Sequence, residues 1–339
     1  MKKRKLLLLG VAFLLLFAAL SVSGCAALGS LYEDGDMLFR YRADIDGYVL
    51  LSYEGTATEV VIPAEVNGKP VRRIGAMAFD GCEGIVSLTV PNSVERIYKG
   101  AFRSCYKSIE RLSIPFLGTE ANQASGHFGE AFGASALTTL HQAISCPIKH
   151  VEITGNTFIP DSAFVGYVSI ETVTLGEGVT KIGTGAFQSL PNLKTVKLPS
   201  TLEKIGSRAF YKCGMLSNIT FPDAVYSIGT SAFGDCELLT SIKLPSNLQV
   251  LGAAAFKGCY QLGEIVFPVG VRSVYDETFY NTRDDKRVYY MGGADDWASL
   301  NIGKYNDYFG SRPYFYSEEE PTDTANAYWH YVNGVPTPW

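Results

Sequence analysis

The side chains best suited to covalent or metal chemistry are seven cysteines and four histidines in a chain of 339 residues. Five of the cysteines share one setting, three residues after the phenylalanine of a recurring pair: Cys82, Cys105, Cys213, Cys236 and Cys259. Leu190 takes the same place after Phe187, which marks a position for a buried apolar side chain, and buried cysteine behaves as a small hydrophobic residue. Since no C-x-x-C pair is present, we expect free buried thiols and no metal site.

No sequence motif for catalysis is present. The chain contains no H-E-x-x-H, P-loop, G-x-G-x-x-G or G-x-S-x-G pattern. Asp284-Asp285 and Asp295-Asp296 are acidic pairs, but they lack the alternating oxygen ligands and the glycine of a calcium loop, which indicates solvated turns. We therefore expect no enzyme and no cofactor, with an unrecognised hydrolase as the third-ranked alternative.

The first segment is typical of an export signal. Lys2 to Lys5 are basic, residues 6–20 form an apolar run, and small residues follow. Fifteen helical residues span about 22 Å, which is short of a hydrocarbon core of about 30 Å. The ending Val22-Ser23-Gly24-Cys25 resembles the lipobox of bacterial lipoproteins. That resemblance implies removal of a signal peptide at 1–24 and a lipid on Cys25, which would anchor the chain on the extracytoplasmic side of a bacterial membrane; the alternative is a plain secretory signal.

The charge balance excludes one class of partner. The chain has 29 Lys and Arg against 34 Asp and Glu, for a net charge of −5, and without Lys2 to Lys5 it would be more acidic still. A nucleic-acid binder needs clustered Lys and Arg to neutralise phosphates. We therefore expect no nucleic-acid partner.

The middle of the chain is a repeat. Ala-Phe pairs recur along it, and they end at Phe79, Phe102, Phe132, Phe164, Phe187, Phe210, Phe233 and Phe256. Phe279 follows in the same series, after a Thr in place of the Ala. The last five intervals between these phenylalanines are all 23 residues. Prolines keep the same period at positions 199, 222, 245 and 268. A unit of 23 residues cannot enclose a core by itself, so stacked copies must bury a continuous one.

Each unit predicts two short strands and a helical turn. Residues 195–198, 218–221, 241–244 and 264–267 alternate polar and apolar side chains, as in a strand with one buried face. A second extended piece ends at a glycine (Gly206, Gly229 or Gly252), where we expect a corner with positive φ. The Ala-Phe stretch follows as a short turn of helix. Adjacent coils lie about 4.8 Å apart, so neighbouring cysteines could also form disulfides.

These features match a known family. Leu193-x-x-Val196-x-Leu198 followed by Ile-Gly-x-x-Ala-Phe-x-x-Cys resembles the BspA-like leucine-rich repeats of bacterial surface proteins, over roughly residues 59–290. The resemblance implies a mainly β solenoid, a leucine-rich repeat array of 23-residue coils. The period is lost in an irregular insertion at 116–149, which is either a loop on the binding face or a neutral elaboration.

Both ends of the array need covers. After a short tether at 25–36, residues 37–58 read as an N-terminal capping hairpin. Residues 275–339 hold sixteen of the 42 aromatic side chains, and 291–339 read as an aromatic-rich C-terminal cap. Residues 314–316 and 328–331 are expected to be the two strands of its closing hairpin.

One row of side chains is the candidate binding face. In leucine-rich repeats the residue between the last two apolar positions of each strand should point outward, which here gives a polar row: Thr89, Ser113, Glu152, Thr174, Lys197, Thr220 and Lys243, then Val266. Solenoids use such rows to bind proteins. We therefore expect a cell-envelope protein that binds an envelope or host protein, with a role in adhesion.

The runner-up is glycan binding by C-terminal aromatic rings. Trp297, Trp329 and Tyr331 are the candidate platform, because planar rings stack on sugars. The competing interpretation is a lid of large rings over the last coil.

Overall fold

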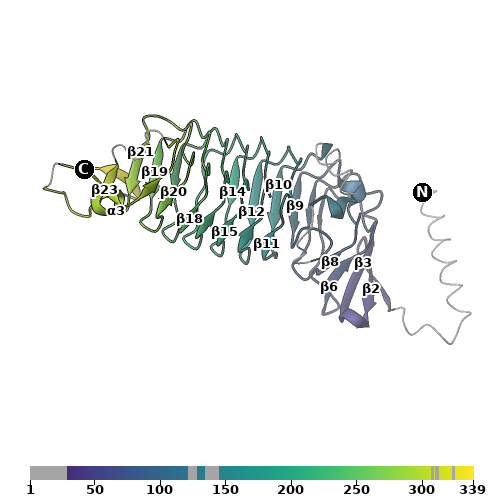
Figure 1. Ribbon diagram of the computed structural model, residues 1–339. Coiled ribbons are helices and arrows are strands. Elements are labelled where there is room, and N and C mark those ends of the chain that lie inside the picture. The colour runs from purple at the N-terminus through teal and green to yellow at the C-terminus, as the bar shows by residue number, and fades with distance from the viewer. Residues whose placement is uncertain (1–28, 121–127, 134–144, 307–308, 310–312, 323–324) are drawn as a thin grey trace, which may run out of the picture.

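The computed structural model describes residues 29–120, 128–133, 145–306, 309, 313–322 and 325–339 (Figure 1). The expected signal peptide, Cys25 and parts of the tether and of the insertion lie outside these residues. The described residues form one elongated rod of stacked coils, so the β-solenoid prediction is confirmed. No helix in the described part is long and apolar enough to span a bilayer.

The first strand of each coil builds a parallel sheet along the rod, here called sheet 1. The strands follow in hydrogen-bonded order except for a break between β14 and β17: β4 (Glu59–Val61), β7 (Ser87–Thr89), β9 (Arg111–Ile114), β10 (His150–Ile153), β12 (Thr172–Leu175), β14 (Thr195–Lys197), β17 (Ser241–Lys243), β19 (Glu264–Phe267), β21 (Arg287–Tyr290) and β23 (Tyr314–Tyr316). At the break, residues 218–221 keep the predicted alternation, with Ile219 and Phe221 buried, but are not assigned as a strand.

The second extended piece of each coil builds a narrower parallel sheet, sheet 2. Its strands are β11 (Phe158–Ile159), β13 (Lys181–Ile182), β15 (Lys204–Ile205), β16 (Ser227–Ile228) and β18 (Val250–Leu251), and β20 (Ser273–Val274) pairs separately with β22 (Asn301–Ile302). In the regular part of both sheets the paired residues are 23 apart, as in Lys181 opposite Lys204 and Ser241 opposite Glu264. The core lies between them.

A column of phenylalanine rings fills the third side of the core. Phe187, Phe210 and Phe233 are fully buried and stack with ring centroids 5.2 and 5.1 Å apart and planes within 12° of parallel. The column continues through Phe279 to Phe309, where the centroids are 4.4 Å apart. The predicted stacking of equal coils is therefore confirmed.

The glycine corners are explained by close packing, and the prediction of positive φ there was wrong. Gly206, Gly229 and Gly252 are absent from the residues with positive φ. A Cβ on Gly229 would instead lie 2.5 Å from the backbone nitrogen of Ser207 in the coil before. The left-handed residue comes two positions later, for example Arg208 with a φ of 54°. A side chain at the glycine would force neighbouring coils apart.

The cysteines of the repeat lie free and buried, as expected. The thiols of Cys213, Cys236 and Cys259 each donate to a phenylalanine carbonyl oxygen of the preceding coil, at 3.1 to 3.2 Å. Burial raises the pKa of Cys213 to about 12 and that of Cys236 well above its usual value. These thiols are packing residues with low reactivity.

The N-terminal cap is larger than the predicted hairpin. Antiparallel β1 (Leu31–Asp34), β2 (Met37–Arg42) and β3 (Gly47–Tyr53), with a 3₁₀ turn at Ala43–Ile45, lead into a parallel pairing of β3 with β6 (Lys69–Ile74). Two short strands complete this sheet, β5 (Glu65–Val66) and β8 (Arg96–Ile97). Residues 31–34, which the sequence assigns to the expected tether, belong instead to this sheet, because they pair with β2 along its edge.

The C-terminal hairpin lies in a different place from the one expected. Residues 314–316 pair in parallel with β21 and with β24 (Ala327–Val332), and the hairpin is formed by β24 and β25 (Val335–Pro338). Asn333 and Gly334 join them with φ of 51° and 79°, as a tight two-residue turn requires. A short helix, α3 (Ala294–Ala298), packs Trp297 against the end of the core.

Proline protects the free edge of this hairpin. The backbone nitrogen of Trp339 bonds to the carbonyl of Tyr328, which fixes the alternation of bonded and non-bonded pairs along β24 and β25. Pro336 and Pro338 fall at non-bonded positions, where an N–H would point outward. Because proline has no N–H, the edge offers no donor there to another chain.

The insertion leaves sheet 1 intact. β9 pairs with β10 in full register, with Arg111 opposite His150, although these residues are 39 apart in sequence. The interruption falls instead between β8 and β11, on the side of sheet 2. A 3₁₀ helix at Phe128–Phe132 gives the Phe column two rings at this level, Phe128 and Phe132, with centroids 5.6 Å apart; a shorter 3₁₀ turn lies at Arg103–Cys105.

Candidate functional site

The outward side of sheet 1, here called the outer face, carries two parallel rows of side chains. The register sets Thr89, Ser113, Glu152, Thr174 and Lys197 opposite one another on successive strands. Lys243 lies opposite Val266 on the next part of the sheet. The second row, two residues earlier on each strand, is Ser87, Arg111, His150, Thr172, Thr195, Asn218 and Ser241.

In its N-terminal half the outer face is bonded to itself. Ser113 donates to the carboxylate of Glu152 at 2.9 Å, and Arg111 pairs with Glu59 at 2.9 Å. His150 Nδ1 lies 2.8 Å from the hydroxyl of Thr172. At the edge of the same region Lys194 binds Glu171, which lowers the pKa of that carboxyl mainly through the hydrogen bond. Few of these groups are left to bind a partner.

In its C-terminal half the outer face is open. Thr195, Asn218 and Thr220 are exposed, and their side chains make no hydrogen bond with another residue of the described ranges. Lys197 is exposed as well. From Thr172 to Lys243 neither row contains an acidic residue. The carboxylates that interact with the two lysines, Glu177 and Asp223, lie outside the rows and accept hydrogen bonds from Ser200 and Ser246.

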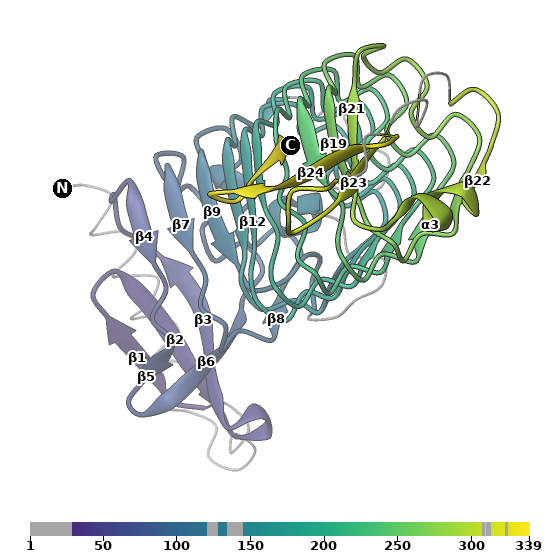
Figure 2. The same ribbon diagram turned by 90° about the vertical axis from the view of Figure 1, so that its left-hand side faces the viewer.

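The C-terminal hairpin forms a wall at the end of the open half. β24 crosses over the strands of sheet 1 (Figure 2), and Trp329 packs its ring 5.3 Å from that of Tyr289. Val266, the last residue of the predicted row, is only 5% exposed beneath this cover. The ammonium of Lys243 lies 5.0 Å from the ring centroid of Tyr331, a cation–π contact that ties the hairpin to the outer face.

The structure does not assemble the predicted aromatic platform. Trp329 is fully buried and donates its indole N–H to the carbonyl of Tyr290 at 3.0 Å. Tyr331 is half-buried against Trp329, with centroids 4.9 Å apart. Trp297 packs elsewhere, against Phe267 and Phe309 of the core. The three rings therefore cover two different surfaces, as parts of a lid do.

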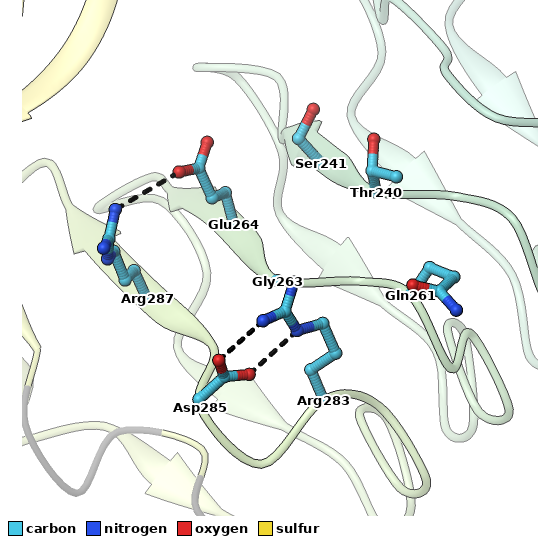
Figure 3. Close-up of a pocket in the computed structure, with 8 residues that line it drawn as sticks. All are labelled: Thr240, Ser241, Gln261, Gly263, Glu264, Arg283, Asp285 and Arg287. Atoms are coloured by element: carbon cyan, nitrogen blue, oxygen red, sulfur yellow. Dashed lines mark hydrogen bonds and ion pairs between the residues drawn. The ribbon is translucent and has the colours of Figure 1, made fainter.

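A polar pocket of about 330 Å³ opens at the starts of β17, β19 and β21, next to this wall (Figure 3). Arg283 donates to both oxygens of Asp285, at 2.8 and 2.6 Å, and this lowers the pKa of Asp285. Arg287 lies 3.7 Å from Glu264. Thr240, Ser241, Gln261 and Gly263 complete the lining.

The pocket was missed from the sequence, although a signal was present. Asp285 stands where other coils have a buried leucine: Leu193, Leu216, Leu239 and Leu262. In a repeat protein such departures mark either an end cap or a site. No group of three or more His, Cys, Asp and Glu in the described ranges could hold a metal ion.

Comparison with known proteins identifies the repeat. The model of the BspA type Leucine rich repeat region matches six copies, over residues 52–125 and 157–284, which is more than half of the chain. No curated protein matches the chain.

Solved leucine-rich repeat structures are similar at low sequence identity. A Treponema pallidum leucine-rich repeat protein is 19% identical, with 81% of this chain and 86% of that chain covered and a TM-score of 0.33. A leucine rich cell surface protein from Faecalibacterium prausnitzii is 20% identical, with 80% and 97% covered and a TM-score of 0.36. A Bacteroides ovatus protein is 19% identical, with 81% and 79% covered and a TM-score of 0.38.

Proposed function

Because the chain belongs to the BspA-type leucine-rich repeat family, we propose that it is a binding protein of the bacterial cell surface that holds a partner protein on its outer face. One observation carries the proposal. The open half of the outer face presents the hydroxyl and amide groups of Thr195, Asn218 and Thr220, which make no side-chain hydrogen bond within the described ranges, beside the exposed ammonium of Lys197. A partner can bond to them without breaking internal bonds.

The charge of the surface limits the partner. Lys197 and Lys243 stand two coils apart, about 10 Å at the spacing of parallel strands. With no acidic residue between them on either row, the surface favours a partner with exposed carboxylates at a similar spacing. The wall formed by β24 and β25 fixes where such a partner ends.

The anchor is part of the same proposal. A lipid on Cys25 would hold the chain to the outer side of the membrane, with few residues between it and β1 at Leu31. The partner is then an envelope protein or a host protein that reaches the membrane-proximal layer. Mass spectrometry of the intact protein from membranes tests this step: an acylated Cys25 as the first residue is expected, and an unmodified N-terminus would contradict it.

Photo-crosslinking tests the binding surface. A photoreactive residue replaces Thr220 on the outer face of the full-length protein in its own cells, and a matched variant carries it at Ser227 on sheet 2. We expect one protein to be crosslinked from position 220 and not from 227, because only the first position faces the proposed partner. Equal adducts from both positions, or none from 220, would refute the proposal.

A further inference from the structure

The polar pocket beside the hairpin is formed where two residues differ from those at the same positions of the other coils. The other coils therefore show which residue the repeat has at each position. The residue seven positions after the repeat phenylalanine is Lys194, Ser217 or Thr240 in three coils and Gly263 in the fourth. A Cβ on Gly263 would lie 3.2 Å from both Cδ and Nη1 of Arg283. Glycine therefore gives the guanidinium room to lie against the backbone of sheet 1.

The next coil makes the second departure. Where the other coils bury a leucine, Asp285 is exposed, and it holds Arg283 through two hydrogen bonds. Replacing a core leucine forfeits its apolar burial. The exchange yields a carboxylate and a guanidinium joined by two parallel hydrogen bonds at the pocket wall (Figure 3).

The charges in the pocket cancel. Arg283 faces Asp285 and Arg287 faces Glu264, so two guanidinium and two carboxylate groups share the site. A simple anion or cation would meet as much repulsion as attraction there. The site instead offers donors and acceptors side by side, with the Gln261 amide and the hydroxyls of Thr240 and Ser241 adding both kinds.

This set of groups matches the hydroxyl groups of a sugar. Each sugar hydroxyl both donates and accepts, so adjacent hydroxyls can bond to a carboxylate and a guanidinium together. A volume of about 330 Å³ is at the small end of ligand pockets and suits a single ring. We propose that the pocket lined by Gln261, Gly263, Glu264, Arg283, Asp285 and Arg287 binds one neutral sugar unit of a saccharide.

The pocket is independent of the predicted aromatic platform and of the protein-binding proposal. It uses none of Trp297, Trp329 and Tyr331, which pack within the protein. Of its lining residues, only Ser241 belongs to the two rows of the outer face between Thr172 and Lys243. The sugar can come from a wall polysaccharide or from a glycan on a partner protein, and the two sources share the chemistry of the pocket.

Saturation-transfer NMR on the full-length protein in detergent tests the proposal. The probes are glucose, galactose, mannose and N-acetylglucosamine, with acetate and inorganic phosphate as charged controls. We expect transfer to at least one neutral sugar and none to the anions. Absence of transfer to all four sugars, or stronger binding of an anion, would overturn the assignment.

Two variants that restore the residues of the other coils distinguish a loss of sugar binding from a loss of folding. Gly263→Thr fills the pocket with the residue found at 240, and Asp285→Leu restores the leucine of the other coils. Each should weaken sugar binding by at least about tenfold with the thermal transition retained. Arg283→Ala is a third variant that removes the donor without adding bulk. Binding that survives all three would contradict the proposal.

Two further arms separate the sources and the proposals. Retention of the protein on insoluble cell-wall polysaccharide indicates that the sugar comes from the wall. Retention on a glycoprotein column that is lost after enzymatic deglycosylation indicates that it comes from a partner's glycan. Retention on neither material, with no saturation transfer to a sugar, counts against the site. Lys197→Glu should leave sugar binding unchanged, and Gly263→Thr should leave the crosslink from position 220 unchanged. Failure of one proposal is thus distinguishable from failure of the other.

Discussion

Removing the side chain of Asn306 should open the C-terminal end of the solenoid. In the regular coils from Phe164 to Phe256, the backbone N–H of each repeat phenylalanine bonds to a carbonyl of the next coil, as Phe233 does to Ala255 at 2.8 Å. At the last such position the N–H of Phe279 donates instead to a side chain, Oδ1 of Asn306, at 3.0 Å. The amide nitrogen of Asn306 in turn donates to the carbonyls of Tyr275 and Gly303, at 2.8 and 2.9 Å.

The size of the effect follows from these three bonds. Asn306 is 7% exposed, so water cannot readily replace them. At a net value of about 1 kcal/mol for each bond, Asn306→Ala should cost about 3 kcal/mol of local stability. Since about 1.4 kcal/mol corresponds to a factor of ten, the amide of Phe279 should exchange on the order of a hundredfold faster.

Hydrogen exchange of single amides measures this loss directly. The matched control is Asn218→Ala, because Asn218 is exposed and makes no side-chain hydrogen bond in the described ranges. Asn306→Ala should speed exchange at Phe279 and leave Phe187 protected, since a repeat array loses stability locally. Unchanged protection of Phe279 would refute the view that this side chain ends the ladder.

Three further perturbations have definite expected outcomes. Phe210→Ala should lower the unfolding free energy in urea by about 3 to 5 kcal/mol, because it leaves a cavity between two stacked rings; a loss below about 1 kcal/mol would contradict the column. Cys213, whose pKa is raised from 9.0 to about 12, should resist thiol reagents at pH 8 until urea is added. Its contribution to the free energy of unfolding should be complete below pH 9 and fall from pH 9 toward pH 12, because the thiol of the unfolded chain ionises first. Rapid labelling of Cys213 in the folded protein would exclude its burial. Trp329→Ala should release the C-terminal hairpin and make residues 327–338 sensitive to limited proteolysis while the repeat stays folded; full resistance would show that Trp329 does not hold the hairpin.

The repeat could be predicted from sequence because its constraints are local and periodic. A 23-residue unit that buries Leu, Ile and Phe at fixed places must stack, and the register then brings equivalent residues such as Lys181 and Lys204 together. The same periodicity identified the cysteine position as part of the core, since Leu190 occupies it in one coil.

The ends could not be predicted as well, because there the pairing depends on tertiary contacts. The sequence predicts residues 314–316 as one strand of the closing hairpin, yet they extend sheet 1 in parallel. Asn333-Gly334 between two extended runs is the stronger local signal, because it predicts a two-residue hairpin turn. At the corner glycines the cause was misidentified, because the distance between coils is invisible in one unit.

The candidate site was likewise predictable from sequence only in part. Periodicity placed Thr89 to Lys243 in one row, but only the structure shows that the N-terminal half is bonded to itself and that Val266 is covered. Burial of Trp329 could not be foreseen from its residue type, since exposed and buried aromatic residues look alike in sequence.

The claim that the outer face binds a partner is tested most directly by one dissociation constant, that of the partner crosslinked from position 220. It should be measured for two matched charge-reversal variants. Lys197 and Lys181 are both exposed strand lysines, the first on the outer face of sheet 1 and the second on sheet 2. Lys197→Glu is expected to weaken binding by at least about tenfold while Lys181→Glu leaves it within about twofold. Equal affinities for the two variants would contradict a binding role for the outer face.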